Sequence, residues 1–176
     1  MKQMKKNTGS ARGFSLIEVM IAMALLVIGL GATLGMFTVA VGDNANHGES
    51  GTRVTEYAQD KMEQLVALSF SDGSTDTTVY PPAATGGTGL GGNLAAGTTV
   101  GGVAPGSPVT GYVDYLTSAG GLQTTATGAF FVRQWSITMN ASQRLKTIKV
   151  YVAALKSLGA GGAPTVTVVC YKTKTT

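Results

Sequence analysis

The sequence predicts an α+β fold, in which one long N-terminal helix packs against a small antiparallel sheet of three to four strands. Residues 19–42 form a run of 24 uncharged, mostly apolar residues, the pattern of a long apolar helix. Apolar residues then recur at helical spacing in 54–69, and in 131–170 they alternate with polar residues as in half-buried strands. A sheet that covers the apolar face of the helix satisfies both elements.

Length and composition limit the classes of protein. A chain of 176 residues suits one domain of ordinary size. A single Cys forms no internal disulfide, and one Cys with one His leaves too few ligands for a closed zinc site. We therefore expect no disulfide framework, no metal and no cofactor.

The positive net charge does not indicate nucleic-acid binding. The formal charge is +4, but four basic residues precede residue 14, namely Lys2, Lys5, Lys6 and Arg12. The remaining 163 residues carry nine basic and nine acidic groups and are neutral overall. The basicity is therefore a local feature of the N-terminus, and no nucleic-acid partner is expected.

Residues 14–42 predict a single-pass membrane helix. Glu18 is their only charge, and the run exceeds the ~20 apolar residues that cross a bilayer. The preceding basic cluster predicts a cytoplasmic N-terminus and an external C-terminal part. A cleaved secretory signal is the alternative, but its apolar core usually spans only ~7–15 residues.

The junction before this helix carries a family resemblance. Residues 13–19 read GFSLIEV, which resembles the type III signal of prepilins, the precursors of type IV pilins and of type II secretion pseudopilins. The resemblance implies that residues 1–13 are a leader, removed after Gly13 by prepilin peptidase. It also implies that the new N-terminal amine, on Phe14, is methylated.

Glu18 is the fifth residue after that junction, as the family pattern requires. A carboxylate within an apolar span is costly and usually has a partner or a function. In a helix it lies about 6 Å along the axis from the amine of Phe14. The resemblance implies that Glu18 meets the terminal amine of a neighbouring subunit in a filament; the alternative is that it reaches the lipid headgroups.

Features of the apolar helix narrow the resemblance to a subgroup of the family. The first proline of the chain is Pro81, and residues 26–31 read LVIGLG, similar to PilV-type minor pilins and I-type minor pseudopilins. The resemblance implies a structural minor pilin that joins or primes a type IV pilus with other major and minor pilins. It would wait in the inner membrane and then reach the periplasm or the cell-surface pilus. The alternatives are a minor pseudopilin of a type II secretion system and a pilus-borne adhesin.

Beyond the membrane the chain predicts three further regions. Residues 43–70 continue the helix, with a kinked or frayed stretch at 42–52 because Gly, Asn and Asp are weak helix formers. Residues 71–128, rich in Gly, Thr and Pro, predict a long surface loop with one short strand within 109–116; it serves either interaction or mere spacing. Residues 129–176 predict antiparallel strands, with a hairpin connection at 140–144.

Several motifs are weak. Residues 87–92 match G-x-G-x-x-G but lack the flanking strand and helix of a dinucleotide site. Gly31 and Gly35 match G-x-x-x-G, which indicates either a close helix contact in lipid or ordinary small-residue packing. Cys170 falls at an inward strand position, typical of a small core residue. No catalytic constellation is recognisable, so an enzyme is not expected.

Charges in the C-terminal domain are segregated along the chain. Residues 43–114 carry a net charge of −6, and residues 133–174 carry +7 with no acidic group. Opposite patches steer association between subunits, so we expect the cluster of Arg144, Lys146 and Lys149 to reach a neighbouring subunit. The alternative is that the two sets of charges face each other within one subunit.

Overall fold

The computed structural model describes residues 13–156 and 162–174, apart from the side chains of residues 43 and 45–47. The predicted leader, residues 1–13, lies outside these residues except for Gly13. The chain divides into two compact units, Met1–Gly42 and Asp43–Thr176.

One helix, α1, runs from Leu16 to Ala67 and contributes to both units. A kinked or frayed stretch was expected at 42–52; fraying is wrong, because the helix continues through it. Side chains there support the backbone: Arg53 pairs with Glu49 at 2.9 Å, and the Thr52 hydroxyl donates to the Gly48 carbonyl. Extending an existing helix costs much less than nucleating one, so a few weak formers do not end it.

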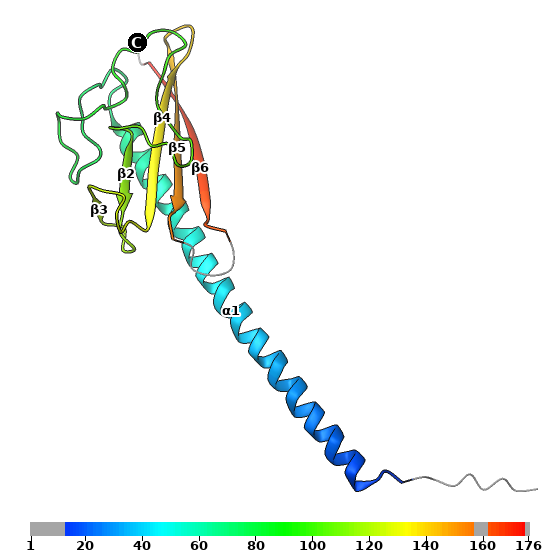
Figure 1. Ribbon diagram of the computed structural model, residues 1–176. Coiled ribbons are helices and arrows are strands. Elements are labelled where there is room, and N and C mark those ends of the chain that lie inside the picture. Colours follow the sequence, from blue (N-terminus) through cyan, green and yellow to red (C-terminus); the bar gives the residue numbers. More distant parts are fainter. Residues whose placement is uncertain (1–12, 157–161, 175–176) are drawn as a thin grey trace, which may run out of the picture. The chain divides into compact units, whose positions relative to one another are not determined.

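The second unit contains one six-stranded antiparallel sheet. Its strands are β1 (Thr99–Gly101), β2 (Val113–Leu116), β3 (Leu122–Gln123), β4 (Phe131–Met139), β5 (Leu145–Ala154) and β6 (Thr165–Thr173). The order is β3-β2-β4-β5-β6, and β1 pairs with the part of β4 beyond β2. Figure 1 shows the labelled strands side by side along the helix.

The predicted α+β fold class is confirmed, and the sheet is larger than the three to four strands expected. The long strands β4, β5 and β6 follow the alternation in the sequence. The additional strands β1 and β3 are only three and two residues long and lie in the Gly-rich region 71–128. Strands this short are completed by their partners rather than by their own pattern, so the sequence does not mark them.

The core lies between the sheet and the second half of α1. Val54, Ala58 and Leu65 are buried at helical spacing, as expected. The facing side of the sheet contributes Trp135 and Ile137 of β4, together with alternate residues of β5, namely Ile148, Val150 and Val152. The predicted hairpin at 140–144 is present, and the Asn140 side chain accepts hydrogen bonds from the Arg144 and Leu145 amides.

Candidate functional site

The N-terminal unit begins with the predicted processing site. Gly13 and Phe14 precede the helix, and Phe14 is 84 % exposed. The Ser15 carbonyl accepts hydrogen bonds from the amides of Glu18 (3.0 Å) and Val19 (3.2 Å), which closes the first turn. Glu18 is therefore in the first turn, where the helix dipole favours a carboxylate.

The first half of α1 is an apolar helix without a cover. Leu16–Gly42 has a mean hydropathy of 2.3, and none of its most apolar stretch is buried. Its length and composition suffice to cross a membrane. A contiguous apolar surface of this size marks contact with lipid or with another protein.

The other predicted residues of this unit are accessible. A Cβ atom added at Gly31 or Gly35 would meet nothing within 4 Å. The hydroxyl of Thr38 donates to the Gly35 carbonyl, so this side chain needs no external partner. Among the described residues, Glu18 makes no ion pair. The chain thus presents Glu18, Gly31 and Gly35 without bringing them to partners of its own.

The second unit contains a cluster of charges between helix and sheet, which we call the buried ion cluster: Lys61, Asp114 and Arg133, with the exposed Asp60 at its margin. Lys61, Asp114 and Arg133 are at most 3 % exposed. The Asp114 carboxylate accepts from Arg133 Nε at 2.7 Å and from Lys61 Nζ at 2.8 Å. Arg133 also donates to Asp60 at 2.7 Å, so α1, β2 and β4 are joined through one cluster.

Burial and charge oppose each other in this cluster. Burial lowers the pKa of Lys61 to about 8, although the Asp114 carboxylate opposes the shift. Burial also acts to lower the pKa of Arg133, but hydrogen bonds and charge from Asp114, and then from Asp60, hold it above its ordinary value. The Lys61 ammonium lies 3.9 Å from the centroid of the Trp135 ring, which adds a cation–π contact.

A second buried lysine organises the Gly-rich region. Lys146 Nζ donates to the carbonyls of Phe70 (2.6 Å), Leu90 (2.7 Å) and Gly92 (2.7 Å), and Lys146 has no exposed surface. The prediction that Lys146 reaches a neighbouring subunit with Arg144 and Lys149 is therefore wrong. An inward position on β5, opposite Met139 of β4, directs Lys146 to the chain's own carbonyls.

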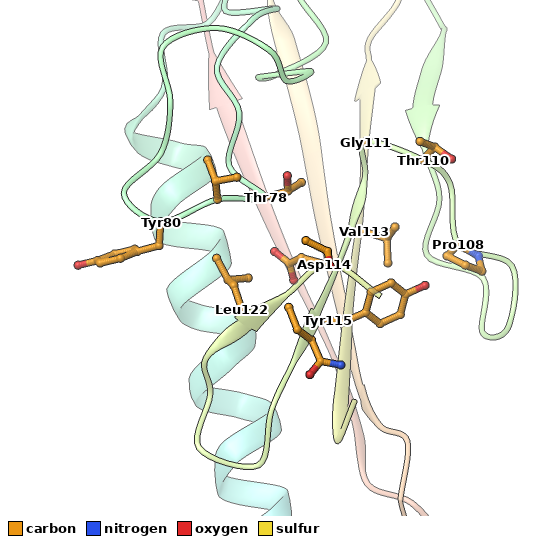
Figure 2. Close-up of a pocket in the computed structure, with 12 residues that line it drawn as sticks. Thr78, Tyr80, Pro108, Thr110, Gly111, Val113, Asp114, Tyr115 and Leu122 are labelled. Carbon is orange, nitrogen blue, oxygen red and sulfur yellow. The ribbon is translucent and has the colours of Figure 1, made fainter. Parts of the chain in front are cut away.

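A pocket of about 770 Å³ opens beside β2 and β3 (Figure 2). Its lining combines hydroxyls, backbone and apolar side chains, and Asp114 is the only charged member: Thr78, Val79, Tyr80, Pro108, Thr110, Gly111, Val113, Asp114, Tyr115, Leu122, Gln123 and Thr124. Both carboxylate oxygens of Asp114 already accept from Lys61 and Arg133. The pocket thus offers surface for binding and has no proton-transfer pair among its lining residues.

Sequence reasoning did not identify the buried ion cluster. One signal was present, since Arg133 interrupts an otherwise apolar face in 131–139. A charge at an inward strand position indicates a buried partner. Asp114 is that partner, and nothing in the Gly-rich sequence around it identifies it as such.

Comparisons with known proteins support the N-terminal features. The family model described as the prokaryotic N-terminal methylation motif matches residues 9–34. No curated protein and no solved structure matches the chain. The motif implies processing by prepilin peptidase, assembly with other pilins, and a structural protein rather than an enzyme. Together with the exposed apolar helix, the match supports a type IV pilin-like protein.

Proposed function

We propose that the chain is a minor pilin of a type IV pilus, most similar to the PilV type. Prepilin peptidase cuts it after Gly13 and methylates Phe14, and the N-terminal helix then enters the filament. The main observation in support is the exposed apolar helix that directly follows the Gly13–Phe14 junction. Its first half has Glu18 as its lone charge and matches the methylation motif.

The apolar surface of the helix suits two environments in succession, the lipid bilayer and the filament. Before assembly, lipid covers its apolar surface, with the basic leader held at the cytoplasmic face of the inner membrane. In the filament, helices of neighbouring pilins replace the lipid, and the open faces of Gly31 and Gly35 admit close approach. Glu18 is then paired with the methylated amine of a neighbouring subunit.

The test is the N-terminus of the chain in filaments sheared from cells. Mass spectrometry should find a 163-residue chain that begins with singly methylated Phe14. Gly13→Val should leave precursor in the membrane, because a branched side chain crowds the scissile bond. Gly9→Val, the same change within the leader, should be cut normally.

Two results would contradict the proposal. Filaments that contain uncut residues 1–13 would exclude processing at Gly13. A processed chain that stays in the cell envelope, and whose deletion blocks protein secretion but leaves pili intact, would identify a pseudopilin of type II secretion.

A further inference from the structure

An exposed apolar tip projects from the second unit on a closed loop, residues 76–83, which we call the Tyr80 loop. Asp76 and Ala83 exchange two backbone hydrogen bonds of 2.8 and 3.0 Å, which close its base. The Asp76 carboxylate also accepts from the Thr78 amide and hydroxyl. At the tip, Tyr80 is 84 % exposed and is followed by two exposed prolines.

Buried contacts hold this loop in place. The Lys61 ammonium donates to the carbonyl of Thr77, which is itself buried. The tip is therefore anchored to the ion cluster between helix and sheet. A large aromatic side chain displayed on an ordered loop loses little conformational freedom on binding, which favours it as an anchor of an interface.

The Tyr80 loop and β6 lie at opposite edges of the sheet. Thr78, Val79 and Tyr80 line the same pocket as β2 and β3 (Figure 2). In the strand order β3-β2-β4-β5-β6, β6 is the far edge. Surfaces at opposite edges of one domain allow a head-to-tail contact between two copies.

The far edge carries an exposed apolar and basic surface, which we call the outer patch: Lys149, Tyr151, Val169 and Tyr171. Val169 and Tyr171 are 45 % and 65 % exposed. Lys149 of β5 lies directly opposite Val169 of β6, so both project from the same face. This face points away from α1, because Ile148 and Val150, the neighbours of Lys149, are buried toward the helix.

The two surfaces are complementary in charge. Glu56, Asp60 and Arg133 line a pocket of about 400 Å³ with Tyr80. Arg133 pairs with Asp60, so the Glu56 carboxylate supplies the acidic charge beside the tip. Within the outer patch, Lys149 is an exposed basic group. An aromatic tip with one acidic neighbour thus matches an aromatic patch that has a lysine within it.

We propose that the Tyr80 loop of one copy of this chain docks on the outer patch of a second copy. The contact is head-to-tail, so each copy presents one surface of each kind. The proposal rests on the proposed assembly of the chain into filaments, and it names the partner and the surfaces of the second unit.

Cysteine cross-linking of the full chain in cells tests the contact. Two differently tagged copies, both in a Cys170→Ala background, carry Tyr80→Cys and Tyr171→Cys respectively. Mild oxidation should give a disulfide-linked product that contains both tags. As a matched control, Tyr80→Cys is paired with Ser142→Cys, an exposed residue of the β4–β5 turn, and should give no product.

A charge reversal measures the electrostatic contribution to the contact between the two copies. Lys149→Glu should lower the yield of the mixed-tag product about three- to fivefold at low salt, the size expected of an exposed pair. Adding Glu56→Lys to the partner copy should restore part of the yield. Lys174→Glu, an equal charge change outside the patch, should leave the yield unchanged.

Three outcomes overturn the proposal: no mixed-tag product in filaments that contain both copies, disulfides only between like positions, or linkage of Tyr80→Cys to a different pilin alone. The proposed function is tested separately, by the mass of the chain's N-terminus and by the presence of the chain in the filament fraction. If the chain is uncut and absent from filaments but the mixed-tag product forms in the membrane, the function fails and the contact stands.

Discussion

Arg133 lies among apolar side chains on the helix-facing side of β4, and its charge is accepted there because two carboxylates surround it. Asp114 binds Nε and a terminal nitrogen of the guanidinium at 2.7 and 3.0 Å. This two-point contact fixes β2 against β4 where the two strands pair. Lys61 shares the same carboxylate, so Asp114 is the common counter-ion of two buried cations, and Asp60 supplies the second negative charge.

The first prediction tests this dependence on Asp114. Asp114→Asn removes the charge that faces Lys61 and Arg133 and leaves both cations buried without it. We expect a loss of about 3–5 kcal/mol in the free energy of unfolding. Asp60→Asn, the same change at a carboxylate that is 54 % exposed, should cost only ~0–1 kcal/mol. Urea denaturation of the full chain in detergent measures both, and equal losses would contradict the role of Asp114.

The second prediction concerns Lys61 and pH. Its pKa of about 8 in the folded chain lies below the ordinary 10.5, with Asp114, Arg133 and Asp60 as the charged groups that face it. Between these values the unfolded chain binds more protons, so the free energy of unfolding rises with pH. The contribution of Lys61 is on the order of 3 kcal/mol over this range.

Two lysine variants isolate that contribution. Lys61→Met should flatten the rise in thermal stability between pH 8 and 10, while Lys149→Met, at an exposed lysine, should keep it. The same rise in both variants would assign the effect to other groups. Burial also lowers the pKa of Lys146, so a smaller rise should remain in Lys61→Met.

At the scale of elements, the periodicity of apolar residues predicted the elements whose inward face is set by hydrophobic packing. The helical spacing of Val54, Ala58 and Leu65 and the alternation in β4, β5 and β6 identified the core, because hydrophobic burial fixes which residues face inward. The region 71–128 has too few apolar residues for such a pattern. Part of its order comes from buried ammonium groups that bind backbone carbonyls, and residue type does not identify which carbonyls these are.

The third prediction tests that account of the Gly-rich region. Lys146→Met leaves the carbonyls of Phe70 and Leu90 without their donor, and leaves the Gly92 carbonyl with the Leu94 amide. A buried polar group that loses its partner costs about 1–3 kcal/mol. Amide exchange at Leu90 and Gly92, whose amides donate to the Asp72 carbonyl, should therefore become about tenfold faster or more.

A matched variant separates this local effect from general destabilisation. Lys149→Met removes a lysine from the other face of the same strand and should leave amide exchange at Leu90 and Gly92 unchanged. Exchange that is equally fast in both variants, or unchanged in Lys146→Met, would show that the three carbonyl contacts do not hold this region.

For the whole molecule, the sequence predicted segregated charges, and the structure shows two uses for them. Asp60, Asp114 and Arg133 pair within the subunit, as the alternative interpretation had it. Glu56, Lys149 and Lys174 stay exposed and are available to other molecules. The sequence gives the positions of the charged residues along the chain but not which of them are buried. Only the fold shows their burial. The exposed apolar helix, in contrast, was predictable because no polar residue beyond Glu18 interrupts its first turns.

The last prediction concerns Glu18, the one charge on that helix. Glu18→Ala should keep the chain in the membrane, because it removes the costly group from an apolar span. It should lower the amount of chain in sheared filaments about tenfold or more, because a neighbour's terminal amine loses its counter-ion in a dry interface. Glu49→Ala, which removes a carboxylate paired with Arg53 at the surface, should leave incorporation unchanged. Normal incorporation of Glu18→Ala, measured by quantitative immunoblotting of filament and membrane fractions, would show that Glu18 only reaches the lipid headgroups.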